Sequence, residues 1–283
     1  MITIKHLDHI SMGAPDWKAQ ADLLERLLGF KFLHSFAAGP KSDFSGCVSQ
    51  VPGTDMEFEV IAPAGERSFV QKFLDESGPG LHHITLEVPS ITEAITELER
   101  MGLHPMGGLQ DDGMWKLTYV HPKESGGILW QLFEPYRFPE NPDRTTTGGL
   151  LGLKRVDHVS MAVADLEKQI AWQERVFGMV AGERWTDDYL AYTGCVMTIP
   201  NSQLQFEIIA PTTPESFVQK FIDTKRAGMH HICCEVDSVD ATAAAMLAEG
   251  IKPFGGVIES DWHKHTFLHP RDSGGVLFQL FEE

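Results

Sequence analysis

The stretch FEVIAP at residues 58–63 returns almost unchanged as FEIIAP at residues 206–211. Other segments flank the two copies in the same order and at an offset of 148 or 149 residues: DHISM at 8–12 with DHVSM at 157–161, SFVQKF at 68–73 and 216–221, HHI at 82–84 and 230–232, and SGGILWQLFE at 125–134 with SGGVLFQLFE at 273–282. Self-similarity at a fixed period marks a repeated structural unit. We therefore interpret the sequence as a tandem duplication.

The composition narrows the class of protein. A chain of 283 residues is long enough for two domains, each with a core of its own. A formal charge of −17 argues against a nucleic-acid partner, and no apolar run approaches the ~20 residues of a membrane span. The four cysteines (Cys47, Cys195, Cys233 and Cys234) make a poor disulfide framework and are expected to be reduced thiols. We expect a cytoplasmic protein without a membrane partner.

Hydrophobic periodicity and turn residues predict the same α+β plan in both halves. In the first half we expect strands at 2–12, 30–36, 46–52, 56–61, 81–88, 104–109, 115–120 and 127–133, with helices at 16–28, 66–76 and 91–101. This order is βαβββ followed by βαβββ. The predicted modules are residues 1–134 and 151–283, joined by a linker at 135–150 that is rich in proline, threonine and glycine.

Side chains alternate between the two faces of a strand, so each key strand places one polar residue opposite its helix-packing face. These residues are His9, Glu59, His83 and Gln131 in the first half, and His158, Glu207, His231 and Gln279 in the second. Two imidazoles, a carboxylate and an amide oxygen form a reasonable ligand set for a divalent transition metal. Any one of these residues alone would more simply be structural. Their joint occurrence in both halves, on matching faces, favours the metal interpretation.

Other polar residues have simpler explanations. His82 and His230 fall on the apolar face of their strands, which favours core histidines over ligands. The SGG turns at 125–127 and 273–275 fit either an anion cradle or a tight hairpin. His263 and His265 have no histidine counterparts in the first half, so any role of theirs belongs to the second half alone.

The repeated motifs resemble the vicinal oxygen chelate superfamily, which is also called the glyoxalase/bleomycin resistance/dioxygenase superfamily, and most closely its methylmalonyl-CoA epimerase members. The resemblance covers essentially the whole chain, twice. It implies that each module pairs two βαβββ units into a cupped mixed sheet around a metal cleft, with the eight residues above as ligands. It further implies one divalent ion per module (Mn, Co, Zn, Ni or Fe(II)), which chelates two neighbouring substrate oxygens and stabilises an enolate.

The chain departs from the epimerase pattern at its proton carriers. Those enzymes have glutamate where this chain has Gln131 and Gln279, and a second acid–base glutamate at positions that correspond to Ser49 and Met197. Glu59 and Glu207 are therefore the expected catalytic bases.

The favoured function is a metal-dependent isomerase, epimerase or lyase that abstracts a proton next to a carbonyl of an acyl-CoA or of a small hydroxy or keto acid. One alternative is a non-haem iron(II) ring-cleaving dioxygenase of the same superfamily, because two histidines and a carboxylate also suit that chemistry. The other is a non-catalytic small-molecule binding protein. The expected partner is a small-molecule substrate, and a homodimer is left open.

Overall fold

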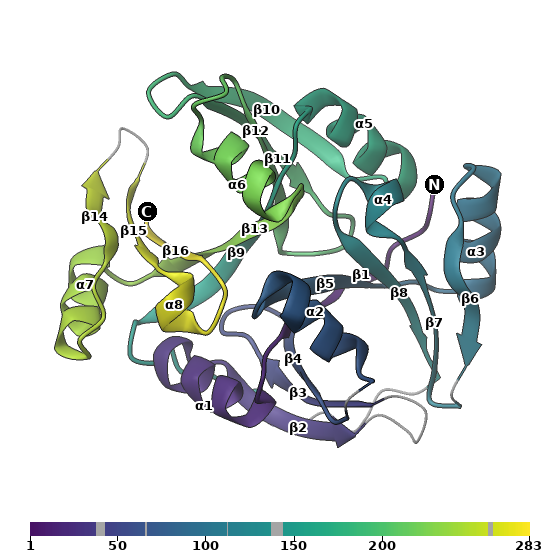
Figure 1. The fold of residues 1–283 in the computed structure, drawn as a ribbon, viewed down its shortest axis with the longest axis horizontal. Helices are drawn as coiled ribbons and strands as arrows, with labels where there is room; N and C mark the ends of the chain where they lie inside the picture. The colour runs from purple at the N-terminus through teal and green to yellow at the C-terminus, as the bar shows by residue number, and fades with distance from the viewer. Residues whose placement is uncertain (38–42, 66, 112, 137–143, 260–262) are drawn as a thin grey trace. The chain divides into compact units, whose positions relative to one another are not determined.

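The computed structural model describes residues 1–283 except 38–42, 66, 112, 137–143 and 260–262, so part of the predicted linker lies outside the described residues. The elements of the first repeat are β1 (His6–Gly13), α1 (Trp17–Leu28), β2 (Lys31–Ala37), β3 (Phe44–Gln50), β4 (Glu57–Pro63), α2 (Phe69–Ser77), β5 (Gly80–Glu87), α3 (Ile91–Arg100), β6 (Pro105–Asp111), β7 (Trp115–Val120), α4 (Pro122–Ser125) and β8 (Leu129–Pro135), as labelled in Figure 1.

The second repeat has the same series. Its elements are β9 (Leu153–Ala162), α5 (Leu166–Phe177), β10 (Val180–Asp187), β11 (Tyr192–Thr198), β12 (Gln205–Pro211), α6 (Phe217–Lys225), β13 (Gly228–Val236), α7 (Val239–Ala248), β14 (Phe254–Glu259), β15 (Lys264–Leu268), α8 (Pro270–Ser273) and β16 (Phe278–Glu282). The predicted βαβββ pairs are confirmed, because every helix and strand expected in the first half is present and recurs in the second.

Each repeat builds one eight-stranded sheet. The strand order is β2-β3-β4-β1-β5-β8-β7-β6 in the first and β10-β11-β12-β9-β13-β16-β15-β14 in the second. Parallel pairs (β5 with β8, and β9 with β12) occur beside antiparallel hairpins, so both sheets are mixed as expected. The first strand of each βαβββ unit therefore lies near the middle of its sheet, which is where the histidines of the predicted ligand sets lie.

The first strand starts later than its apolar pattern predicted, at His6 rather than Ile2. The backbone N–H of Ile2 instead donates to the carbonyl of Val176, at the end of α5, and the Ile2 side chain is buried. A partner distant in sequence thus takes the hydrogen bond that a strand neighbour would have accepted.

Helix α1 begins and ends as its sequence predicts. The carboxylate of Asp16 accepts hydrogen bonds from the N–H groups of Lys18 and Ala19. The helix stops at Gly29, whose φ of 71° lies in the left-handed region that glycine adopts most readily. A Cβ atom there would also lie 1.8 Å from the carbonyl oxygen of Thr147, so neither the conformation nor the close packing admits a side chain.

The chain forms two compact units, and each unit combines parts of both repeats. One unit comprises residues 1–9, 83–140 and 158–230. At its core Trp130 from the first repeat is fully buried, with its ring centroid 4.8 Å from Phe177 and 5.5 Å from Phe206 of the second. Burial of such large apolar side chains contributes about 1.5–3 kcal/mol each.

The other unit comprises residues 10–82, 141–157 and 231–283. Here Phe278, the counterpart of Trp130, lies with its ring centroid 6.3 Å from Phe30 of the first repeat, and Phe30 lies 5.1 Å from Phe58. Both units therefore have an aromatic core to which both repeats contribute.

The SGG turns are packing features. The Gln169 side chain donates to the Ser125 carbonyl at 3.0 Å, and Gln20 donates to the Ser273 carbonyl at 2.8 Å. A Cβ on Gly126 would meet the Gln169 amide oxygen at 2.0 Å. The glutamine side chains thus fill the space beside these turns, which explains their glycines better than an anion cradle does.

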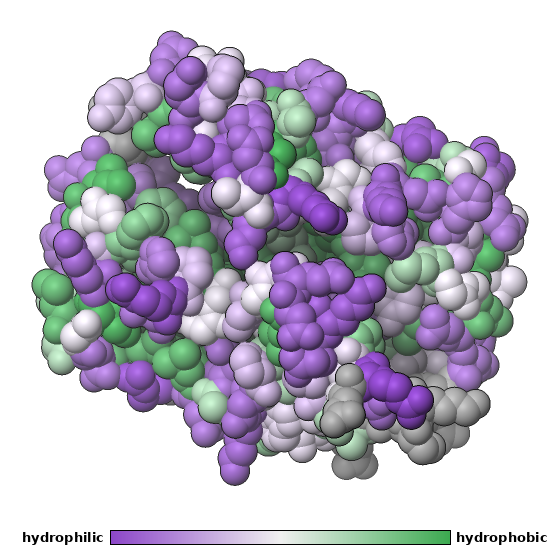
Figure 2. Space-filling model, viewed as in Figure 1, coloured by the Kyte–Doolittle hydropathy of each residue, from purple (hydrophilic) through white to green (hydrophobic). Residues whose placement is uncertain are grey.

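Figure 2 shows one face of the molecule, on which hydrophilic residues predominate and hydrophobic ones are scattered between them. Within the part of the chain that the structure describes, none of the helices has the length and apolar character needed to cross a bilayer.

Candidate metal centres

The first candidate centre brings together three of the residues that strand alternation selected. His9 lies on β1, Glu59 on β4 and His83 on β5, and one ligand atom from each lies within 4.8 Å of the others. The imidazole rings of His9 and His83 meet edge to face, with centroids 5.5 Å apart. His83 is 6 % exposed and His9 is 9 % exposed, whereas Glu59 is partly exposed, so the set lies at the edge of the protein interior.

A hydrogen-bond chain leads from this set to Gln131 on β8. The Thr85 hydroxyl lies 2.8 Å from Nε2 of His9 and donates to Oε1 of Gln131 at 3.2 Å. Strand pairing explains the contact, because Thr85 lies opposite Gln131 in the parallel β5–β8 pair. Thr85 thus connects Gln131 to His9 of the His/Glu/His set, and coordination of a metal by Gln131 stays a prediction.

The second candidate centre repeats the arrangement with His158 on β9, Glu207 on β12 and His231 on β13, again within 4.8 Å of one another. Nε2 of His158 lies 3.7 Å from a carboxylate oxygen of Glu207. Gln279 on β16 pairs with Cys233, the counterpart of Thr85, so it shares the face of His231.

Both sets fit a divalent transition metal by their donor atoms. Zinc binds imidazole nitrogen and carboxylate oxygen at about 2.0–2.2 Å, and two such bonds separate their donor atoms by up to about 4 Å. A set already within 4.8 Å therefore needs only small side-chain adjustments. Two histidines and one carboxylate also leave coordination positions open for substrate oxygens.

The register of β3 and β4 corrects one sequence inference. Ser49 pairs with Phe58, whereas Val48 pairs with Glu59, and directly paired residues share a face. In the second repeat Met197 likewise pairs with Phe206 rather than with Glu207. Ser49 and Met197 thus lie on the face away from the carboxylates. The residues that share the face of the carboxylates are Val48 and Val196, which have no ionisable group.

His82 and His230 lie in aromatic surroundings. The His82 ring packs against Phe69 and Phe73 of α2, with a centroid distance of 4.8 Å to Phe73. His230 contacts Phe217 and Phe221 of α6 in the same way. Burial lowers the pKa of both histidines to about 4, because the charged imidazolium loses its hydration.

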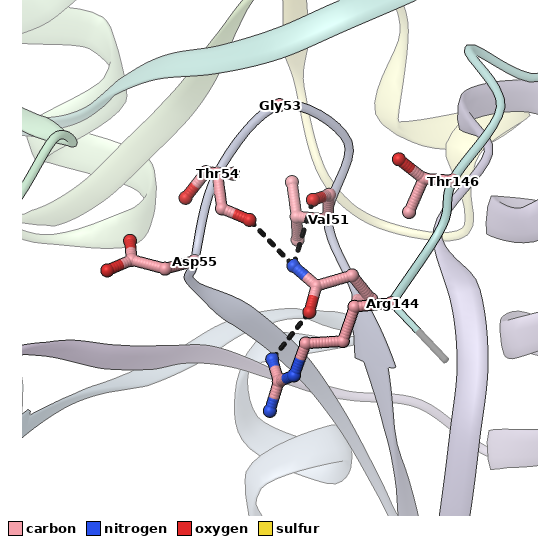
Figure 3. Close-up of a pocket in the computed structure, with 7 residues that line it drawn as sticks. Val51, Gly53, Thr54, Asp55, Arg144 and Thr146 are labelled. Carbon is pink, nitrogen blue, oxygen red and sulfur yellow. Dashed lines mark hydrogen bonds between the residues drawn. The ribbon is translucent and has the colours of Figure 1, made fainter. Parts of the chain in front are cut away.

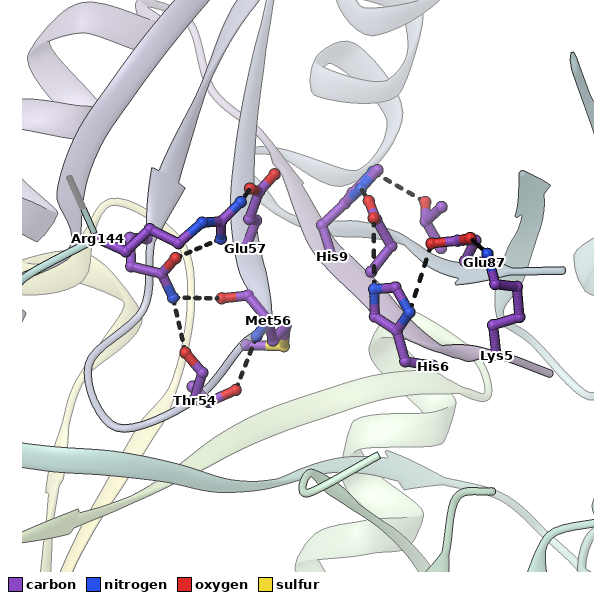
Figure 4. A network of polar contacts seen from close by, with 11 residues as sticks. Lys5, His6, His9, Thr54, Met56, Glu57, Glu87 and Arg144 are labelled. Carbon is purple, nitrogen blue, oxygen red and sulfur yellow. Dashed lines mark hydrogen bonds and ion pairs between the residues drawn. The ribbon is translucent and has the colours of Figure 1, made fainter. Parts of the chain in front are cut away.

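The structure adds a charged network that sequence analysis missed. His6, Asp8 and Glu87 bring their ligand atoms within 4.8 Å of one another (Figure 4). The His6 ring lies between the two carboxylates, with one nitrogen 3.8 Å from Asp8 and the other 3.5 Å from Glu87. Lys5 also forms an ion pair with Glu87. Two of its members come from β1 and the third from β5, which is the neighbouring strand of the sheet. Alternation within one strand offered no signal for this cluster, because it does not say which strands are neighbours.

The second repeat explains this network as ion pairing. Arg155 stands in the place of His6, and its guanidinium donates to Asp157 at 2.5 Å and to Glu235 at 2.7 Å. Lys154 and Arg155 hold the pKa of the Glu235 carboxyl below its usual value by hydrogen bonding. A basic side chain between two carboxylates is the feature that both repeats share.

A separate cavity of ≈ 480 Å³ lies beside the turn after β3 (Figure 3). The Arg144 guanidinium there donates to Gln50 at 2.5 Å and to Glu57 at 2.6 Å. The Gln50 amide in turn donates to the carbonyl of Thr54 at 2.7 Å. These bonds hold the turn, and the lining includes none of the predicted metal ligands.

Comparison with known proteins shows the family to which the chain belongs. The sequence model of the glyoxalase/bleomycin resistance protein/dioxygenase superfamily matches residues 8–119 and again residues 157–268. The chain belongs to this superfamily. The first match runs from β1 to β7, and the second runs from β9 to β15. The superfamily module therefore occurs twice, as the repeats predicted.

Among curated members of the superfamily, the chain is 31 % identical over 137 residues to the mitochondrial methylmalonyl-CoA epimerase of Homo sapiens, which covers 47 % of this chain and 77 % of that protein. It is 30 % identical over 130 residues to an ethylmalonyl-CoA/methylmalonyl-CoA epimerase of Cereibacter sphaeroides, which covers 44 % and 96 %. These matches each span about one module.

A solved structure matches both modules at once. A triple mutant of 4-hydroxymandelate synthase from Streptomyces coelicolor superimposes with a TM-score of 0.71 over 99 % of this chain and 92 % of that one, at 14 % identity. At this identity the likeness shows the fold, and it covers both modules of the chain.

Proposed function

We propose that the chain is a metal-dependent isomerase, epimerase or lyase that removes a proton next to a carbonyl group, with one metal in each module. The observation that carries the proposal is the pair of His/Glu/His sets, each with its ligand atoms within 4.8 Å. Similarity to methylmalonyl-CoA epimerases supports an acyl-CoA or a small hydroxy or keto acid as the substrate class.

In this proposal, His9, His83 and Glu59 bind the metal in the first module, and His158, His231 and Glu207 bind it in the second. A divalent cation held there supplies Lewis-acid stabilisation of negative charge on a substrate oxygen. Gln131 and Gln279 are uncharged, so they complete the ligand sets without adding negative charge. Their amide groups also have no proton that titrates near neutral pH, so these side chains are not general acids or bases.

The proton would go to a carboxylate oxygen of Glu59 or Glu207. Each is the carboxylate of its histidine set, and a carboxylate that turns from the metal toward the substrate can accept a proton. Val48, which pairs with Glu59, offers no competing base from β3. Burial and the nearby Glu59 charge raise the pKa of the Cys47 thiol to about 12, so this neighbour stays protonated and is not a base at neutral pH.

Solvent-deuterium exchange tests the proposal. Protein reconstituted with Mn²⁺, Co²⁺ or Zn²⁺ would be incubated in D₂O with acyl-CoA thioesters and with 2-hydroxy and 2-keto acids, and deuterium incorporation followed by mass spectrometry. We expect metal-dependent exchange at the carbon next to the carbonyl. Absence of exchange from every substrate with full metal occupancy would refute the reaction class.

The same ligand set favours one further candidate. Two histidines and one carboxylate also form the facial set of non-haem iron(II) oxygenases. Oxygen consumption by Fe²⁺-loaded protein with a catechol, together with no deuterium exchange, would replace the isomerase proposal with a ring-cleaving dioxygenase. If neither reaction occurs but ligands bind, a non-catalytic binding protein remains.

Three narrower expectations stay predictions. The module bounds 1–134 and 151–283, with a linker at 135–150, await limited proteolysis of the intact chain. Four free, buried cysteines support a cytoplasmic location, which imaging of a tagged protein would test. A homodimer would be detected by sedimentation equilibrium.

A further inference from the structure

The two modules differ in the strand that borders their glutamine ligand. In the second module β15 is antiparallel to β16, with Phe267 opposite Gln279 and His265 opposite Phe281. Directly paired residues share a face, so His265 lies on the face of Gln279. Gln279 in turn pairs with Cys233, two residues from His231 on the same face of β13. His265 therefore belongs to the sheet face of the second candidate metal centre.

The intervening residues of β15 confirm this orientation. Lys264 forms a 2.5 Å ion pair with Asp240 in the first turn of α7, and the side chains of Thr266 and Leu268 are fully buried. Helix α7 packs against this side of β15. His265 consequently points away from the helix.

His265 is a half-buried imidazole with one ring nitrogen that lacks a hydrogen-bond partner among the described residues. This nitrogen, Nδ1, is buried. The His263 ring lies beside it, at a centroid distance of 4.8 Å. Burial, with a smaller effect of His263, lowers the pKa of His265 to about 4, so the ring is neutral at pH 7. A neutral imidazole with an unused polar atom is prepared to bond a ligand.

The first module has apolar and aromatic residues in the same places. Leu117 pairs with Phe133 and Tyr119 with Gln131, so Leu117 is the counterpart of His265. Trp115, the counterpart of His263, packs against Phe133 with a distance of 6.0 Å between the ring centroids. The two modules thus share the His/Glu/His set but have different side chains beside it, His265 in the second module and Leu117 in the first.

We propose that the second module recognises a substrate with a carboxylate on the carbon chain beyond its metal-chelating oxygens, through His265 with His263 beside it, whereas the first module takes a substrate with an apolar substituent there. Two adjacent imidazoles offer two hydrogen-bond donors, which matches the two oxygens of a carboxylate. Leu117 offers no donor and favours hydrocarbon. This proposal rests on the proposed function, because it assumes that a substrate is chelated at each centre.

The sheet geometry sets the length of the substituent. Gln279 and His265 are diagonal neighbours across an antiparallel pair, which places their Cα atoms about 7–8 Å apart. A group two or three bonds beyond the chelating oxygens spans that separation. A dicarboxylate with a two-carbon spacer is accordingly the probe of choice.

The test compares two 2-hydroxy acids that differ only at the end of the chain: 2-hydroxyglutarate, which ends in a carboxylate, and 2-hydroxy-5-methylhexanoate, which ends in an isosteric dimethyl group. Binding is measured calorimetrically on full-length, Mn²⁺-loaded chains in which one centre is disabled at a time, by His9→Ala/His83→Ala or by His158→Ala/His231→Ala. We expect the intact second centre to prefer 2-hydroxyglutarate at least about tenfold, as one charge-assisted hydrogen bond allows. The intact first centre should prefer the dimethyl acid.

Exchange of His265 and Leu117 between the modules identifies their contribution to the substrate preference. His265→Leu should abolish the preference of the second centre, and Leu117→His should give the first centre a preference for 2-hydroxyglutarate. His265→Asn keeps a hydrogen-bond donor and should restore part of the preference, which separates recognition from a packing defect. Manganese content, measured for every variant, shows that the centre itself is retained.

The outcomes distinguish this proposal from the function on which it rests. If both acids bind both centres without a preference, or if His265→Leu leaves the preference unchanged, the assignment of His265 is wrong and the metal-dependent function stands. If neither acid binds a metal-loaded centre, the recognition proposal falls, whereas the metal-dependent function is decided separately by the deuterium-exchange test. A rise in the pKa of His265 on 2-hydroxyglutarate binding, followed by the NMR shift of its ring, would support direct contact.

Discussion

Nδ1 of His9 lies 2.6 Å from Oδ2 of Asp8 (Figure 4). A carboxylate on one ring nitrogen orients the ring, and the other nitrogen, Nε2, lies 2.8 Å from the Thr85 hydroxyl that bonds Gln131. Such partners orient metal-binding histidines and raise their basicity. The short distance therefore has a direct consequence for metal affinity in the first module.

Replacement of Asp8 should weaken this centre. We expect Asp8→Asn to lower Mn²⁺ or Zn²⁺ affinity of the first module about 10- to 100-fold, since the amide accepts the hydrogen bond but brings no charge. Competitive metal titration in the His158→Ala/His231→Ala background measures the first centre alone. Asp75→Asn, which removes an exposed carboxylate bonded to Gln71, is the matched control and should have no effect.

The two adjacent histidines of β5 should respond differently to mutation. Wild type should bind two metal ions per chain, and His83→Ala should reduce the number to one. His82→Ala should leave two ions bound but lower the free energy of unfolding by about 2 kcal/mol, because it leaves a cavity against Phe69 and Phe73. Elemental analysis and urea unfolding give the two readouts. Loss of metal from His82→Ala with retention in His83→Ala would contradict the assignment of faces.

Removal of the proposed bases should abolish turnover while preserving the metal. Glu59→Gln and Glu207→Gln each keep an oxygen ligand and nearly the same volume. The double variant should lose about 10²- to 10⁴-fold in the rate of deuterium exchange at full metal occupancy, the usual contribution of a general base. Each single variant measures the share of its module. Undiminished exchange in the double variant would place the base elsewhere.

Stability should fall in mild acid because of the buried histidines. The pKa of His82 and of His230 is lowered to about 4 in the folded chain, against 6.5 for a free side chain. The unfolded chain therefore binds more protons between these values, so the stability is complete above pH 6.5 and is lost as pH falls toward 4. At pH 5 the expected loss is about 2 kcal/mol for each histidine.

Urea unfolding between pH 7.5 and pH 5 checks this sign. The His82→Phe/His230→Phe variant keeps an aromatic ring in both places but cannot be protonated, so its stability should depend less steeply on pH. The variant and the wild type have the same carboxylates. The difference between their slopes of unfolding free energy against pH therefore measures the contribution of the two histidines. Equal slopes would show that these two side chains are not buried as neutral groups.

Much of the fold could be predicted because the decisive signals are local. Strand alternation at 58–63 and 206–211, the Asp16 cap and the Gly29 stop each depend on residues close in sequence. The His/Glu/His sets were also predictable, because alternation assigns one face to each strand and the duplication repeats the assignment. Local rules, however, do not fix the register between strands.

Tertiary structure decided the features that depend on pairing. The β3–β4 register moved Ser49 away from Glu59, and pairing of β15 with β16 placed His265 on the ligand face. A one-residue shift of register exchanges the faces of a strand, so these positions follow only from long-range hydrogen bonds. The contacts of His6 and Arg155 with carboxylates also depend on strand pairing.

By itself, the sequence determined the duplication, the order of elements and the identity of the residues that can bind a metal. Each of these follows from the spacing of residues within a short segment or from the repeat of that spacing. Only the tertiary structure decided that compact units form from parts of both repeats, with Trp130 packed on Phe177 in one and Phe30 on Phe278 in the other. Two repeats with nearly the same hydrophobic pattern can each pack on themselves or on the other. The choice depends on complementary side-chain shapes at contacts more than 40 residues apart, which no local pattern records.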